Sequence, residues 1–72
     1  MARVYLLFGS THDTMKAESV LQAAGVACKV VMKPAVIRVD CGLAIRTPEE
    51  SGDGAVAVLQ AAGLAPRGVH TV

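Results

Sequence analysis

Cys41 and Gly42 are the two neighbouring residues of this sequence best suited to covalent chemistry. They end a loop that begins at Lys33-Pro34, and an apolar run follows them directly. A thiol at the junction of a loop and a buried strand is partly open to solvent and rigidly held from one side, which suits a reacting sulfur. The sequence therefore predicts thiol chemistry at Cys41, with Gly42 allowing another group to approach the sulfur closely.

A second group of polar residues, Gly9-Ser10-Thr11-His12, follows the first apolar run of the chain. The hydroxyl of Ser10 or Thr11 can cap a helix that begins here. The free amides and positive dipole end of such a helix lower the pKa of a nearby thiol. His12 is either a base or proton donor for that thiol, or a solvated residue of the helix start.

Other residues of the chain bear on the same chemistry. Lys33 and Arg38 add positive charge from the loop, whereas Asp40 disfavours a neighbouring thiolate. Cys28 stands in an apolar context, so we expect a small buried hydrophobe, or a resolving thiol if it faces Cys41.

An internal repeat indicates how the elements that position these residues are organised. Val20-Leu21-Gln22-Ala23-Ala24-Gly25 returns as Val58-Leu59-Gln60-Ala61-Ala62-Gly63, although Ala-rich helices that end in Gly also resemble one another by chance. Each copy predicts a helix end with a left-handed glycine cap. The pattern gives two strand-helix-strand halves, with strands over residues 3–8, 28–32, 42–46 and 66–70. We expect core positions at Ala17, Val20, Leu21 and Ala24 in the first helix, and at Ala55, Val58, Leu59 and Ala62 in the second.

Two such halves predict a ferredoxin-like βαββαβ fold of the α+β class. Its four-stranded antiparallel sheet has the order 4-1-3-2, and both helices cover one face. The end of the first strand and the start of the third then share one edge, so Gly9, Ser10, Thr11 and His12 should lie beside Cys41 and Gly42.

Composition bounds the class of protein. The 72 residues suffice for one domain, residues 1–72, and the net charge of +1 gives no general attraction to nucleic acid. We expect a cytoplasmic protein with free thiols, because no signal peptide or membrane-spanning run is present. Two Cys and two His without close spacing predict no metal site, and no cofactor motif is apparent.

Three parts of the chain together resemble a known family: Tyr5-Leu6-Leu7-Phe8-Gly9-Ser10-Thr11-His12-Asp13, then Pro34 and Ile37, and finally Asp40-Cys41-Gly42-Leu43-Ala44. They are similar to the selenium/sulfur (Se/S) carrier protein-like family of small bacterial domains. The resemblance implies a carrier that holds sulfur or selenium on Cys41 as a persulfide or selenosulfide. Arg38 and Val39 depart from the small hydroxyl residues that the family tends to have there, which leaves open the hydrogen bonding of the sulfur and the preferred chalcogen.

The expected function is thus a carrier rather than a stand-alone enzyme. A donor such as a cysteine desulfurase would load Cys41, and an acceptor protein would take the chalcogen. The alternative is a non-catalytic regulatory module that binds a ligand or a protein, which the fold equally allows. RNA binding is disfavoured, because Tyr5 and Phe8 are the only aromatics available for base stacking. The edge strands also allow a homodimer.

Overall fold

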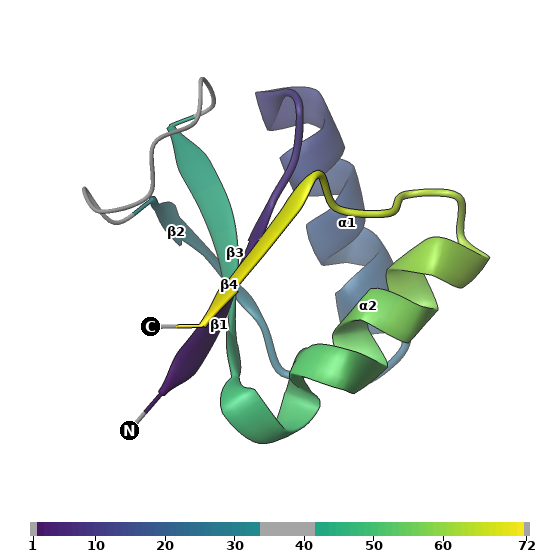
Figure 1. The fold of residues 1–72 in the computed structure, drawn as a ribbon. Coiled ribbons are helices and arrows are strands. Elements are labelled where there is room, and N and C mark those ends of the chain that lie inside the picture. The colour runs from purple at the N-terminus through teal and green to yellow at the C-terminus, as the bar shows by residue number, and fades with distance from the viewer. Residues whose placement is uncertain (1, 34–41, 72) are drawn as a thin grey trace.

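A computed structural model describes residues 2–33 and 42–71 of the chain (Figure 1). Its elements follow one another as strand, helix, strand, strand, helix, strand, with a short 3-10 turn before the second helix. Their bounds are β1 Arg3–Leu7, α1 Thr11–Ala23, β2 Lys29–Met32, β3 Leu43–Pro48, η1 Glu49–Ser51, α2 Gly52–Ala61 and β4 Gly68–Thr71.

The four strands form one antiparallel sheet in the order β2-β3-β1-β4, which is the predicted order read from the other side. β1 and β3 are the central pair, with Leu6 opposite Ile45, and β4 flanks β1 with Val69 opposite Leu6. Figure 1 shows α1 and α2 on one side of this sheet. The predicted ferredoxin-like arrangement is therefore confirmed.

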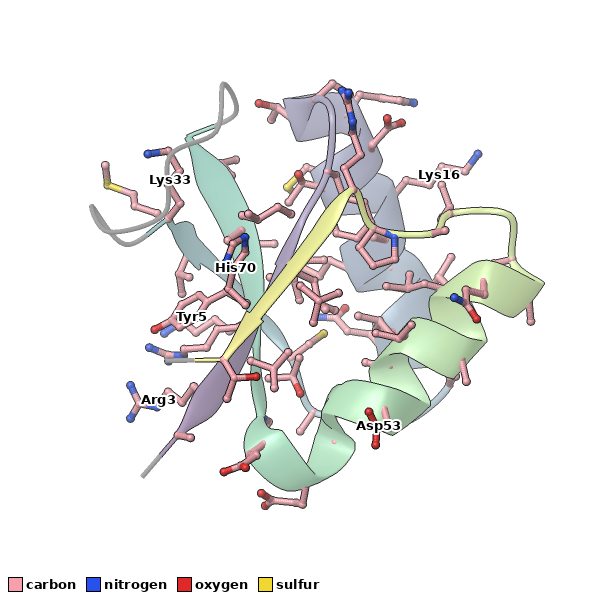
Figure 2. All side chains as sticks on the ribbon, viewed as in Figure 1. Arg3, Tyr5, Lys16, Lys33, Asp53 and His70 are labelled. Carbon is pink, nitrogen blue, oxygen red and sulfur yellow. The ribbon has the colours of Figure 1, made fainter. Side chains whose placement is uncertain are left out.

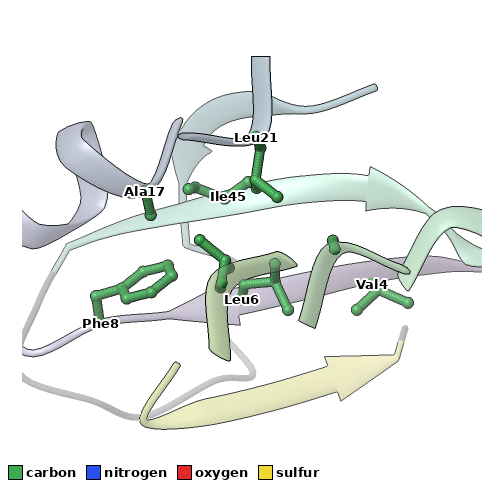
Figure 3. Packing of buried hydrophobic residues seen from close by; sticks show 8 residues of the cluster. Val4, Leu6, Phe8, Ala17, Leu21 and Ile45 are labelled. Carbon is green, nitrogen blue, oxygen red and sulfur yellow. The ribbon is translucent and has the colours of Figure 1, made fainter. Parts of the chain in front are cut away.

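The core lies between the sheet and the helices. Val4 and Leu6 of β1, and Phe8 directly after it, are buried and point toward the helix layer (Figure 3), because successive side chains of an extended chain face opposite sides. They pack with residues of α1, β3 and α2: Ala17, Leu21, Ile45, Ala55 and Leu59. Phe8 thus belongs to the core and offers no ring to the open face of the sheet.

Both helices end as the repeat predicts. Gly25 and Gly63 have φ values of +77° and +74°, in the left-handed region where glycine is favoured. The expected burial of Ala24 and Ala62 was wrong, because each is the C-cap residue of its helix and is exposed. The helical spacing of the core positions stops one turn earlier than the apolar sequence suggests.

The connection between β3 and α2 is short. β3 continues through Thr47 to Pro48, and only η1 separates it from α2, which begins at Gly52. Gly52 is buried against β1: a Cβ built there would lie 2.9 Å from Cγ2 of Val4. The glycine lets the first turn of α2 approach the sheet closely.

Candidate functional site

The strand register brings two distant parts of the sequence to one edge of the sheet. β1 and β3 are antiparallel with Leu6 opposite Ile45, so the chain leaving β1 at Gly9 and the chain entering β3 at Gly42 lie at the same edge. Residues 10–12 follow Gly9 immediately. The predicted convergence of Gly9 and the α1 start on the Gly42 side of the sheet is thus present in the described residues.

Ser10 is the N-cap of α1. Its Oγ accepts a hydrogen bond from the Asp13 amide at 3.1 Å, and its carbonyl oxygen accepts bonds from the Thr14 amide and hydroxyl at 3.1 and 3.0 Å. Thr11 and His12 are exposed in the first turn. The dipole of the 13-residue helix directs positive potential to this end, and the carboxylate of Asp13 opposes it.

Lys33 meets Gly42 across the β2–β3 ladder. The Lys33 amide donates a hydrogen bond of 2.9 Å to the Gly42 carbonyl, which extends the pairing of Met32 with Leu43. Gly42 is exposed, and a Cβ built there would meet no described atom within 4 Å. The backbone just before β3 is therefore accessible, and Lys33 is brought to it by strand pairing.

Arg67 is a residue of this edge that the sequence analysis missed. Its amide donates a 2.7 Å hydrogen bond to the Leu7 carbonyl, at the point where β4 begins beside the end of β1. Its side chain lies against Gly9, where a built Cβ would be 3.1 Å from Nη1. The signal was available, because a strand order of 4-1-3-2 already places the start of the fourth strand beside the end of the first.

Several predicted residues lie outside the described part of the chain. These are the nucleophile Cys41 and the loop residues Arg38 and Asp40. The described residues of the site are Gly9, Ser10, Thr11, His12, Lys33, Gly42 and Arg67. Together they supply a capped helix N-terminus, two cationic side chains and an accessible glycine at the edge where Gly42 enters β3.

Cys28 is less buried than the small buried hydrophobe that the sequence predicts. It is partly buried and packs against the core, while one side lines a groove at the opposite end of the sheet. Burial, and secondarily the negative charge of Glu18, raise the pKa of the Cys28 thiol. The raised pKa lowers the thiolate fraction of Cys28 and makes it a weaker nucleophile than an ordinary thiol.

Two properties of the described residues bear on other classes of function. Across residues 2–33 and 42–71, the His, Cys, Asp and Glu side chains nowhere gather in threes as metal ligands would. Neither α1 nor α2 has the length and apolar character needed to cross a bilayer.

Comparison with known proteins gives one finding that covers the chain. A family model described as "Putative Se/S carrier protein-like" matches residues 3–71, from the first residue of β1 to the last residue of β4. A search among curated proteins found no match. The matched segment contains the Gly9–His12 helix start and the Cys41-Gly42 pair. The chain belongs to the Se/S carrier protein-like family.

Proposed function

We propose that this protein carries sulfur or selenium on the thiol of Cys41, as a persulfide or selenosulfide, and passes it from a donor protein to an acceptor protein. The observation that carries the proposal is the family match over residues 3–71, which includes Cys41 and Gly42. A carrier needs one nucleophilic sulfur, positive charge near it and a surface for its partners, and the described edge supplies the charge.

The transfer is a thiol exchange without net oxidation or reduction. The Cys41 thiolate attacks the outer sulfur of a persulfide on the donor. A new S–S bond forms, the donor S–S bond breaks, and its electron pair leaves on the donor cysteine as a thiolate. An acceptor thiolate then attacks the outer sulfur on Cys41 and releases the Cys41 thiolate. A donor selenosulfide transfers its outer selenium to Cys41 by the same exchange.

The residues at the edge have distinct parts in this proposal. The N-terminus of α1 and the charges of Lys33, Arg67 and Arg38 favour the thiolate over the thiol. His12, exposed in the first turn of α1, exchanges a proton with the leaving or entering thiol. Gly42 leaves room for the partner at the backbone before β3.

The experiment compares the two cysteines as matched variants. Cys28→Ala leaves Cys41 as the only thiol, and Cys41→Ser leaves only Cys28. After incubation with a cysteine desulfurase and cysteine, intact-mass spectrometry should show one added sulfur atom on Cys28→Ala and none on Cys41→Ser. Sulfur gained by Cys41→Ser, or by neither variant with a donor active on other acceptors, would contradict the proposal.

The second candidate is a binding module without covalent chemistry. One face of the sheet carries no helix, so a partner has a surface to contact among the described residues. In that case Cys41→Ala would bind the partner as tightly as the natural chain. The mass measurement separates the two candidates, since only a carrier acquires the chalcogen.

A further inference from the structure

The acidic residues of the described chain are confined to one layer, which also carries one lysine, Lys16 on α1. All of its acidic residues lie on the helical elements: Asp13 and Glu18 on α1, Glu49 and Glu50 on η1, and Asp53 on α2. The strands carry none of them. The two faces of the molecule therefore differ in sign.

The face of the sheet away from the helices is basic. His70, Tyr5, Arg46 and Lys29 stand opposite one another across β4, β1, β3 and β2, so their side chains share that face. Arg3 lies two residues before Tyr5 and points the same way. We call the set Arg3, Tyr5, Lys29, Arg46 and His70 the basic sheet face. Figure 2 shows Arg3, Tyr5 and His70 projecting from the sheet on the side opposite Asp53.

A groove of about 670 Å³ continues this face at one end. Arg3, Lys29 and Arg46 line it together with Pro48, Thr47 and Glu50. Arg3 and Lys29 are exposed and Arg46 is half-buried, so three cationic side chains border one open hollow. A short acidic side chain that enters the groove would meet three cations and a single carboxylate, that of Glu50.

The face runs along β3 toward the edge where Gly42 enters the strand, past Ala44 and Leu7, which lie on the same face and are buried. Arg46 is four residues along β3 from Gly42, about 13 Å in an extended strand. A protein docked over the groove is large enough to reach the Gly42 backbone as well. A small anion bound in the groove would not.

We propose that the basic sheet face docks an acidic surface of the protein that gives or takes the chalcogen, with a carboxylate of that partner in the groove beside Arg3, Lys29 and Arg46. This inference rests on the proposed carrier function, because it names the docking surface of that carrier. Complementary charge accelerates the encounter of two proteins and fixes their orientation.

The composition of the face favours a protein partner over nucleic acid. Single-stranded nucleic acid is held by aromatic rings on which successive bases stack. The basic sheet face offers one phenol ring, Tyr5, which is half-buried against Leu7 and Ala44. Charge without a stacking platform suits carboxylates on a folded protein surface.

The test uses a defined acidic probe and the full chain. The probes are a fluorescent peptide of alternating Glu and Ser, the same peptide with Gln in place of Glu, and a thymidine oligonucleotide of equal charge. Binding is measured by anisotropy at low salt and again at about 0.15 M, where exposed charges are largely screened. Amide chemical-shift changes in the labelled protein show which residues the probe contacts.

Lys29→Glu and Lys16→Glu are the matched variants. Both replace an exposed lysine and change the charge equally, but Lys29 is on the basic sheet face and Lys16 on α1. We expect Lys29→Glu to weaken binding of the Glu peptide at least about fivefold and Lys16→Glu to change it less than about twofold. The shifts should centre on Tyr5, Arg46 and His70.

Three results would overturn the inference: equal loss in both variants, equal binding of the Gln peptide, or tighter binding of the oligonucleotide on the same residues. Loading of Cys41 by inorganic polysulfide, which needs no docked protein, tests the carrier function separately. Loading without binding of the Glu peptide refutes the docking surface alone. If the peptide binds but no donor loads Cys41, the carrier function is refuted. The proposal that the basic sheet face docks a donor or acceptor of the chalcogen is then refuted as well.

Discussion

The side chain of Arg67 lies directly against Gly9, so that a Cβ built at Gly9 would be 3.1 Å from Nη1 and 3.2 Å from Cδ. The contact joins the start of β4 to the residue that precedes the N-cap of α1. A guanidinium is thereby held at the edge that the carrier proposal assigns to thiolate chemistry, by a residue distant from Gly9 in sequence.

We predict that Arg67→Gln slows alkylation of Cys41 at pH 7, because a cation that favours the thiolate is removed. The expected effect is roughly twofold to fivefold, as for a solvent-exposed charge interaction of up to about 1 kcal/mol. The measurement is the rate of iodoacetamide reaction in a Cys28→Ala background. Lys16→Gln, which removes a cation from the solvent side of α1, is the control and should leave the rate unchanged. An equal rate in Arg67→Gln and the parent would show that Arg67 does not act on the thiol.

Gly52 and Gly54 of α2 allow a test of how closely this helix packs against β1. A Cβ at Gly52 would lie 2.9 Å from Cγ2 of Val4, whereas one at Gly54 would meet nothing within 4 Å among the described residues. Gly52→Ala should therefore destabilise the fold by about 1–3 kcal/mol through overpacking. Gly54→Ala should stabilise it by up to about 1 kcal/mol, since alanine has a higher helix propensity than glycine. Urea unfolding of both variants checks the opposite signs, and a stable Gly52→Ala would mean that α2 can move away from β1 at little cost.

The N-cap hydrogen bond of Ser10 should contribute to the free energy of unfolding as much as helix caps usually do. Ser10→Ala removes the acceptor of the Asp13 amide and should lower the free energy of unfolding by about 1 kcal/mol. Ser10→Asp keeps a side-chain acceptor for the Asp13 amide and should retain most of the stability that Ser10→Ala loses. Ser19→Ala is the matched control, because the Ser19 hydroxyl only donates a 3.4 Å bond to Met15 within the exposed helix; its effect should be within about 0.5 kcal/mol. Thermal unfolding compares the three, and equal losses at Ser10 and Ser19 would rule out a specific cap.

The pKa of Cys28 predicts how stability depends on alkaline pH. Burial raises this pKa in the folded chain. When the pH exceeds the ordinary pKa of a thiol, the folded chain therefore keeps a proton on Cys28 that the unfolded chain releases. The folded state binds more protons there, and the stability contribution of Cys28 falls as pH rises through that window. We expect the stability of the natural chain relative to Cys28→Ala to decrease between about pH 8 and 10. Urea unfolding at both pH values measures it. Cys41→Ser should retain the decrease, and a difference between the natural chain and Cys28→Ala that does not change with pH would contradict the assignment.

Much of the fold could be predicted because the two halves repeat. Periodic apolar residues and a terminal glycine in each half define a helix and its end, and Gly25 and Gly63 do adopt the left-handed conformation. The errors fall at boundaries. Ala24 and Ala62 read as core residues because alanine is compatible with both interior and cap, and only the position of the cap decides their exposure.

The part of the site that depends only on strand order could be predicted from the sequence. Antiparallel central strands bring Gly9 and Gly42 to one edge, and the sequence supports that order. Predicting the position of Arg67 and the basic sheet face requires more than strand order. It also requires knowing which face of the sheet each side chain occupies and which residue lies opposite it. Tyr5, Arg46 and Lys29 are far apart in sequence, and a shift of one residue in register would send their side chains to the other face.

The separation of charge between the two layers has a consequence for how the molecule moves in solution. A formal net charge of +1 predicts little net attraction to other charged molecules. Acidic helices behind a basic sheet nevertheless give the domain an electric dipole moment that runs from the helix layer to the sheet. In the field of an acidic protein the domain would rotate before contact, presenting β1 and β3 first. Its rate of productive collision would therefore fall with added salt, which screens this attraction.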